Sequence, residues 1–236
     1  AGQHQVSLAL QDGSTFDPLG TAMPATRTET GFRLSGEKRM VLDAMTAHSF
    51  VVIARTAGSP GEEQGLSAFL ISRDAPGLRV TRTEMVDSRQ CGVVSFDDVD
   101  VDAGALMGEV DGAWPALERT LDIAAIGFSA ELLGLSLEAF ERTVAYIKER
   151  KQFGQVIGSF QGLQHRAAAL FAELELARSI TLKALQAIDA EAENLSVLAS
   201  AAKAKLSEVA RLACIDGVQM HGGIVMTDEY DIGLFL

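Results

Sequence analysis

The feature that most constrains the fold is a change in the spacing of apolar residues about halfway along the chain. Up to about residue 104, short runs alternate apolar and polar residues, as half-buried strands do. From about Trp114 onward, apolar residues recur at steps of three and four, as the buried face of a helix requires. The sequence therefore predicts an α+β protein in which a β half precedes a helical half.

The first half contains six runs with strand character, separated by turn-forming stretches such as "DGST", "GSPGEEQG" and "DAPG". No helical pattern lies between them, which favours an antiparallel β-barrel or sandwich. The six runs are Val6–Gln11, Gly31–Leu42, Phe50–Thr56, Ser67–Arg73, Leu78–Met85 and Gly92–Val101.

The second half predicts three long helices with short connections, which is typical of an antiparallel helical bundle. The first helix is expected from about Trp114 to Lys151 and the second from about Gln161 to Ala190. The third begins near a plausible N-cap at Asn194 and continues to about Met220. We expect two domains, residues 1–104 and 105–236.

Charge and cysteine content exclude several classes of protein. The formal net charge is −12, which argues against a nucleic-acid partner because phosphates would be repelled. Two distant cysteines without a C-x-x-C motif fit a reducing cytoplasm and predict neither a disulfide nor a metal site. No uninterrupted apolar run reaches about 18 residues, so no membrane span is expected. The first residue is Ala1 instead of Met, and the last residues, "DEYDIGLFL", end without a helix cap or a polar tail. We therefore expect a piece of a longer protein.

Two segments combine polar side chains with helix ends. In "ERKQFGQVIGSFQ", Arg150 lies in a last helical turn, two glycines build the connection, and Gln161 opens the next helix. In "DGVQMHGGIVMTDE", Gln219 precedes the Gly222-Gly223 pair. A guanidinium, two amides and a glycine pair suit a pyrophosphate. Taken singly, each segment is equally explained by a helix-end charge or a glycine helix stop.

These segments resemble the acyl-CoA dehydrogenase family, whose pattern is R-x-x-F-G-x-x-x-x-x-F-Q followed, some sixty residues later, by Q-x-x-G-G. The resemblance covers the whole chain. It implies that residues 1–104 are the family's middle β domain and residues 105–236 an incomplete C-terminal helical domain. The family's N-terminal helical domain has no counterpart in the sequence.

The resemblance implies an FAD-dependent oxidoreductase of fatty-acid metabolism that removes an α-proton from an acyl-CoA thioester while hydride leaves for flavin N5. Expected partners are same-family subunits, in homo- or hetero-oligomers, and an electron-transfer flavoprotein as electron acceptor. Members bind FAD at a subunit interface. Arg150 would contact the pyrophosphate of a neighbour's FAD, with Phe153 beside it. The residues expected at the ADP part are Gln161, Gln219, Gly222 and Gly223.

The part of the pattern that surrounds the flavin ring is altered. In the family's T-E-P-G-x-G-S-D segment, Gly13 and Asp17 fit, but Leu10 and Gln11 replace the threonine and glutamate. In the W-I-T-N segment, Met40 and Leu42 stand where tryptophan and threonine flank the ring. Leu42 cannot donate a hydrogen bond to the flavin.

No catalytic base is assigned. Most members place the glutamate beyond the H-G-G segment, and others place it on the first bundle helix, where this chain has Ala124 followed by Ala125 instead of arginine. Four acidic residues lie nearby and are more simply interpreted as solvated charges: Asp122, Glu131, Asp228 and Glu229. Two histidines, His165 and His221, are more simply interpreted as structural.

Three interpretations remain open. The chain is a working dehydrogenase subunit, or a degenerate partner that completes the FAD site of another chain, or a flavin monooxygenase of the same fold. The segments "GEKRMVLDA" and "HGGIVMTDEYDIG" resemble the small subunit of heteromeric members that act on pimeloyl-type or steroid side-chain CoA esters. That resemblance would explain why the ADP-side motifs are kept and the ring-side motifs altered. The sequence does not distinguish fatty, dicarboxylic and steroid acyl groups.

Overall fold

The computed structural model describes residues 2–227 and 229–235 of the chain. These residues form two compact units, the first ending at Leu117 and the second beginning at Glu118. The division therefore falls inside the first long helix, and the domain boundary expected at residue 104 stays a prediction. Asp228, one of the acidic residues considered above, lies outside the described residues.

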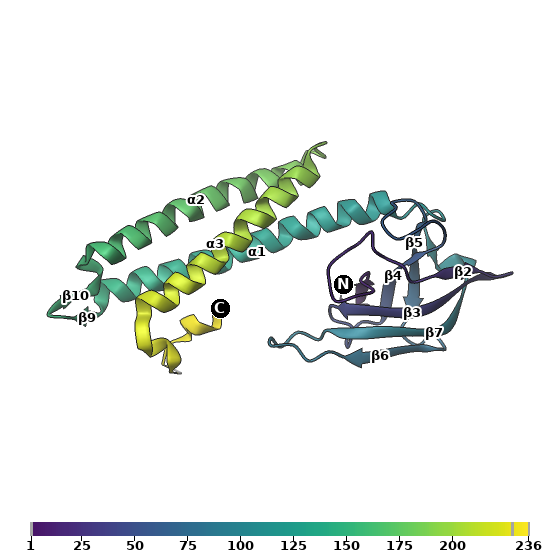
Figure 1. The fold of residues 1–236 in the computed structure, drawn as a ribbon, viewed down its shortest axis with the longest axis horizontal. Helices are drawn as coiled ribbons and strands as arrows, with labels where there is room; N and C mark the ends of the chain where they lie inside the picture. The colour runs from purple at the N-terminus through teal and green to yellow at the C-terminus, as the bar shows by residue number, and fades with distance from the viewer. Residues whose placement is uncertain (1, 228, 236) are drawn as a thin grey trace. The chain divides into compact units, whose positions relative to one another are not determined.

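The first unit is a β-sandwich of two four-stranded sheets (Figure 1). One sheet has the order β1 (Val6–Ala9), β4 (Ser49–Arg55), β5 (Leu66–Ser72) and β8 (Leu106–Met107). The other has the order β2 (Ala25–Arg27), β3 (Gly31–Val41), β7 (Gly92–Asp102) and β6 (Leu78–Arg82). Two separate sheets confirm the sandwich and not the closed barrel. One pairing departs from the antiparallel prediction, because β1 and β4 run parallel.

The sandwich core consists of the inward-facing residues of both sheets. Phe32 of β3 and Phe69 of β5 meet edge to face, with ring centroids 5.1 Å apart. Burial alternates along parts of β3 and β5, as the sequence pattern predicts, whereas nearly every residue of β4 is buried. Other fully or nearly fully buried members are Leu34, Val41, Phe50, Val52, Ile71, Val94, Phe96 and Val99.

A buried ion pair fixes the segment between β1 and β2. Lys38 of β3 is fully buried and donates hydrogen bonds to the Leu10 carbonyl at 2.8 Å and to Asp12 Oδ1 at 2.5 Å. The other Asp12 oxygen accepts bonds from the backbone N–H groups of Ala22 and Met23. Burial lowers the pKa of Lys38, and the charge of Asp12 opposes that effect. The pair therefore anchors the altered ring-side segment to the sandwich.

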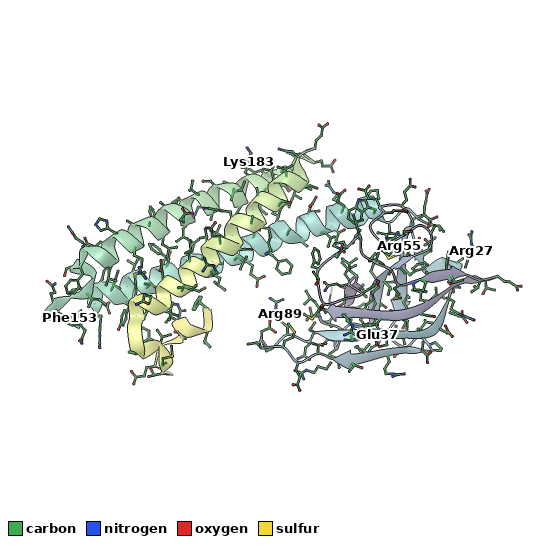
Figure 2. The ribbon with its side chains drawn as sticks, viewed as in Figure 1. Arg27, Glu37, Arg55, Arg89, Phe153 and Lys183 are labelled. Atoms are coloured by element: carbon green, nitrogen blue, oxygen red, sulfur yellow. The ribbon has the colours of Figure 1, made fainter. Side chains whose placement is uncertain are left out.

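A second buried cation is Arg55 of β4, which is labelled in Figure 2. Backbone carbonyls hold it. Its guanidinium donates to Thr21 and Leu19 on one side and to Gln64, Glu62 and Ala57 on the other. These carbonyls belong to the segment before β2 and to the loop between β4 and β5. One arginine therefore ties two irregular segments to the end of β4.

The second unit is the predicted three-helix arrangement. Its helices are α1 (Trp114–Glu149), α2 (Gln161–Asp189) and α3 (Leu195–His221), each within two residues of the predicted bounds. Apolar residues of all three helices pack together, including Leu132, Leu137 and Phe140 of α1 against Leu170, Leu174 and Leu206. Short elements complete the chain: η1 (Ala103–Ala105), β9 (Lys151–Gln152), β10 (Gln155–Val156), η2 (Ile157–Ser159), η3 (Gly222–Met226) and η4 (Asp231–Phe235).

Helix α1 carries an apolar surface that is largely uncovered. By length and composition alone it could cross a membrane, since one 18-residue stretch has a mean hydropathy of 1.5. Only 22% of that stretch is buried, and Ile123 and Phe128 are 38% and 41% exposed. Length and composition are weak support for a span, because core helices of soluble proteins satisfy the same criteria. The expectation of no membrane span stays a prediction.

Candidate functional site

The turn between α1 and α2 is a tight β-hairpin that presents an aromatic side chain to solvent. Strands β9 and β10 pair Gln152 with Gln155, leaving Phe153 and Gly154 as a two-residue loop. Both have positive φ, +53° and +80°, as a type I′ turn requires. Phe153 is 88% exposed (Figure 2). An aromatic residue held in a left-handed conformation and out of the core indicates a binding role more than a packing role.

The hairpin is closed by backbone contacts that leave the Arg150 side chain outside. The Arg150 N–H donates to Tyr146 and its carbonyl accepts from Ile157, both at 2.9 Å. Within residues 2–227 and 229–235, the Arg150 guanidinium has no hydrogen bond or ion pair. An unpaired exposed guanidinium at this position is available to an anionic ligand.

Gly158 lets the connection pass close to α1. A Cβ atom there would lie 2.7 Å from the Ile147 carbonyl oxygen, a backbone atom that cannot move aside cheaply. We expect Gly158→Ala to lower the free energy of unfolding by about 1–3 kcal/mol through this overlap. Gly134→Ala, in open space on α1, is the control and should raise it by about 0.5–1 kcal/mol. Urea unfolding of both variants checks the prediction, and equal effects would contradict it.

The end of α3 is anchored by a buried histidine. His221 stacks on Tyr146 with ring centroids 4.3 Å apart, and its Nδ1 donates to the Gly217 carbonyl at 2.7 Å. Its Nε2 is buried without a hydrogen-bond partner among the described residues. Burial lowers the pKa of His221, opposed by the Gly217 bond, so the ring is kept neutral. Gly222, with φ +72°, then ends the helix in a conformation that glycine adopts at little cost.

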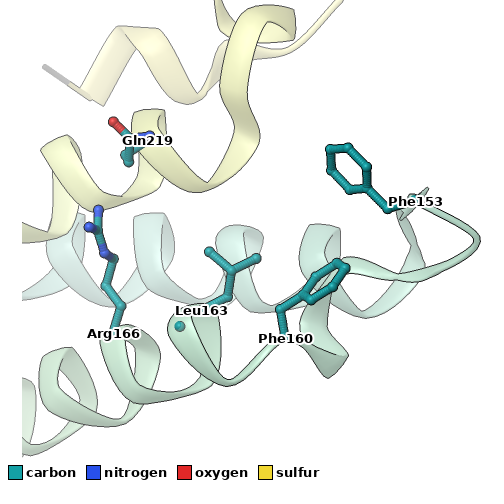
Figure 3. A pocket seen from close by; sticks show the side chains of 6 residues that line it. Phe153, Phe160, Leu163, Arg166 and Gln219 are labelled. Atoms are coloured by element: carbon teal, nitrogen blue, oxygen red, sulfur yellow. The ribbon is translucent and has the colours of Figure 1, made fainter.

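These elements enclose two adjoining hollows. The Arg150 hollow, about 480 Å³, is lined by Arg150, Phe153, Gln219, His221 and Gly223 together with Tyr146, Gln152, Ile157, Phe160, Leu163, Met220 and Ile224. The Arg166 hollow, about 540 Å³, is lined by Phe153, Phe160, Gly162, Leu163, Arg166 and Gln219 (Figure 3). Four of these residues line both hollows: Phe153, Phe160, Leu163 and Gln219. The two hollows therefore form one groove, of a total size suited to a small organic ligand.

Four of the six residues that the sequence singled out come together here. Arg150, Phe153, Gln219 and Gly223 line the groove, although the turn and α3 are far apart in sequence. Gln161 at the start of α2 and Gly222 are not among the lining residues that the structure describes. Sequence reasoning missed Arg166. The sequence did indicate where Arg166 would lie, because it follows Gly162 and Leu163 by four and three residues and so shares their face of α2.

The candidate acids do not gather into a second site. Asp122 accepts a hydrogen bond from Ser196. This contact between α1 and α3 explains the Asp122 carboxylate without a catalytic role. Glu131, Glu229 and His165 are exposed. Among the described residues there is no group of three His, Cys, Asp or Glu side chains that could hold a metal ion.

The altered ring-side positions lie at a bulge that ends β3. The register between β3 and β7 shifts between Lys38 and Val41, and Met40 and Asp43 have φ of +51° and +54°. The bulge leaves the Met40 and Leu42 side chains 40% and 42% exposed. Strained backbone that presents apolar side chains to solvent is typical of a binding surface. Of the positions that fit the family, Asp17 accepts a bond from the Gly20 N–H.

Comparison with known proteins gives one consistent family. Residues 111–236 match the acyl-CoA dehydrogenase C-terminal domain model and residues 10–99 the middle domain model. A probable acyl-CoA dehydrogenase of Bacillus subtilis, YngJ, is 34% identical over 92% of the chain and 57% of its own length. The structure of butyryl-CoA dehydrogenase from Megasphaera elsdenii superimposes with a TM-score of 0.91 at 28% identity, covering 99% of this chain and 62% of that one.

An FAD complex of PigA superimposes with a TM-score of 0.90 at 27% identity, covering 98% of this chain and 61% of that one. In each case the match takes in less than two thirds of the compared protein's length. Since one family model covers more than half of the chain and a second covers most of the remainder, the chain belongs to the acyl-CoA dehydrogenase family.

Proposed function

We propose that this chain is part of an FAD-dependent acyl-CoA dehydrogenase and that its groove binds the ADP half of an FAD. The observation that carries the proposal is the convergence in one hollow of Arg150, which has no partner among the described residues, with the Gln219 amide, Gly223 and an exposed Phe153. A guanidinium and an amide suit a diphosphate and ribose, and an exposed aromatic ring suits a base. The donor set therefore fits the nucleotide half of FAD.

Each residue has a separate role in this proposal. Arg150 donates to the diphosphate oxygens and neutralises their charge. Gln219 both donates and accepts at the middle of the groove. Gly223 allows close approach of the backbone after α3. When bound, FAD supplies the two-electron acceptor for α,β-dehydrogenation of an acyl-CoA thioester.

The uncovered apolar surface of α1 supports the proposal that the chain works in an oligomer. Ile123 and Phe128 are large exposed apolar residues on one long helix. Burial of such a surface by a second subunit is favourable in proportion to the apolar area covered. Same-family subunits are the partners proposed for it. An electron-transfer flavoprotein as electron acceptor, and a cytoplasmic location, stay predictions from the resemblance and the composition.

A second candidate function is favoured by the bulge after β3. Met40 and Leu42 offer no hydrogen-bond donor where the family has tryptophan and threonine beside the flavin ring. Ala124 and Ala125 likewise supply neither a carboxylate nor a guanidinium on α1. On this account the chain completes the ADP side of a partner's FAD and has no competent ring site of its own.

The FAD content of the purified protein separates the two candidates. A self-sufficient dehydrogenase contains one FAD per chain, and an acyl-CoA such as butyryl-CoA bleaches its visible absorbance under anaerobic conditions. An auxiliary subunit is colourless alone and gains FAD only with its partner, at one FAD per two chains. Failure to retain FAD in either setting would contradict both. Rapid oxygen consumption by the reduced protein, with no electron transfer from an acyl-CoA, would instead indicate a monooxygenase.

A further inference from the structure

The first strand of the sandwich is fastened at its start by two histidines. Strand β1 lies at the edge of its sheet and runs parallel to β4. Just before β1, the Gln5 N–H donates to His48 Nδ1 at 3.1 Å, and the His4 and His48 rings lie with their centroids 5.2 Å apart. His4 Nε2 forms a hydrogen bond with the Ser49 hydroxyl at 3.0 Å. These two side chains, the histidine clasp, therefore join the entry of β1 to the start of β4.

The contact between Gln5 and the clasp requires a neutral His48. An imidazole nitrogen accepts a hydrogen bond only while it carries no proton, and both ring nitrogens are donors in the charged form. A proton on His48 Nδ1 therefore replaces the bond from the Gln5 N–H with two N–H groups that face each other. Histidine is the side chain whose charge ordinarily changes between about pH 5 and 8, so this contact is open to change by mild acid.

Protonation of the clasp would add positive charge where no anion is paired with it. Arg73 follows β5, and its guanidinium donates to the carbonyls of Ala44 and Ala47 in the turn that leads to His48. Within residues 2–227 and 229–235, neither ring is bonded to a carboxylate, although two acidic residues lie on the same segments: Asp43 and Asp74. A charge gained by His48 would therefore lie beside the His4 ring and near a permanent cation.

We propose that the histidine clasp is a pH-sensitive device that holds β1 on β4 while both rings are neutral and releases β1 when His48 is protonated. Strand β1 leads directly into Leu10 and Asp12, which bind the buried Lys38 ammonium. Mild acid therefore frees the strand that precedes the altered ring-side segment, while the Lys38 ion pair and the rest of the sandwich stay in place. The proposal rests on the clasp alone and is independent of the proposed FAD site.

Hydrogen–deuterium exchange of the purified chain at about pH 7.5 and about pH 5.5 tests the proposal, with each rate corrected for the intrinsic exchange rate at that pH. The protection of a peptide that covers β1 should fall about five- to tenfold at the lower pH, which corresponds to the loss of one hydrogen bond. A peptide that covers β7, in the other sheet, is the internal reference and should keep its protection.

Two variants of His48 identify the group that responds to pH. Asparagine in His48→Asn offers an acceptor oxygen that does not titrate, and phenylalanine in His48→Phe keeps a ring against His4 without a titrating group. Each should make the protection of β1 independent of pH, whatever its level. His165→Asn is the matched control and should retain the full fall, because His165 is an exposed histidine of α2 with no hydrogen bond among the described residues.

Equal protection of β1 at the two pH values in the wild-type chain overturns the proposal. An undiminished fall in a folded His48 variant overturns it as well, because another group would then be responsible. Thermal unfolding at about pH 7.5 shows whether each variant is folded, and either His48 variant alone is sufficient for the comparison.

Discussion

ADP should bind the Arg150→Ala variant about 10- to 100-fold more weakly than the wild-type chain. Arg150 has no partner among the described residues, so its guanidinium is available to ADP. The size of the loss follows because hydrogen bonds to a charged group are worth about 1.5–3 kcal/mol and each 1.4 kcal/mol is a factor of ten in affinity. Because the variant loses the full charge in the groove, pyrophosphate binding should fall by a similar factor. Calorimetric titration at fixed ionic strength measures both.

Arg150→Lys and Arg178→Ala serve as controls for this result. Lysine retains the charge but not the bidentate fork, so an intermediate affinity is expected. Arg178→Ala removes a surface arginine from the same unit and should leave ADP binding unchanged. An Arg150→Ala variant that binds ADP as tightly as wild type would remove the main support for the proposed site.

Asp12→Ala should be the most destabilising single substitution considered, at about 3–5 kcal/mol. It leaves the fully buried Lys38 ammonium with the Leu10 carbonyl as its remaining partner, and it frees the Ala22 and Met23 N–H groups. The matched control is Asp100→Ala, which breaks a 2.7 Å ion pair with Arg33 at the exposed surface of the same unit. Solvent screens that exposed pair, so Asp100→Ala should lower the free energy of unfolding only slightly. Urea unfolding at neutral pH compares the two.

The loss of unfolding free energy caused by Asp12→Ala should shrink as the pH rises. Burial lowers the pKa of Lys38 in the folded protein below its usual 10.5, and Asp12 opposes that shift. Without Asp12 the folded-state pKa falls further. Between that pKa and 10.5 the unfolded chain binds more protons than the folded one, so stability rises with pH across that window. A deficit that is the same at neutral pH and at about pH 10, or no larger than that of Asp100→Ala, would contradict this account.

The sequence was most informative where local pattern decides structure. The three helices and six of the strands follow from apolar spacing, and the start of α2 at Gln161 was predicted to the residue. The parallel pairing of β1 with β4 was missed, because Val6 opposes Ser49 and nothing local signals a contact over that distance. The two- and three-residue strands β8 and β2 are too short to show alternation.

The groove was predictable only in part for a similar reason. Arg150, Phe153 and Gln219 belong to motifs and could be singled out, but their convergence depends on how α1 and α3 pack. Arg166 looks like an ordinary surface charge on an alanine-rich helix until Asp216 and Gln219 of α3 are placed opposite it. The buried Lys38 sits in a strand whose sequence gives no indication of its Asp12 partner.

The most direct test of the account is a crystal structure of the chain with ADP bound. The account predicts ADP in the groove, with diphosphate oxygens within about 3.2 Å of the Arg150 guanidinium and the adenine against Phe153 and Phe160. ADP bound on another surface, or bound in the groove with its diphosphate out of reach of Arg150, would contradict the proposal that this chain forms the nucleotide half of an FAD site.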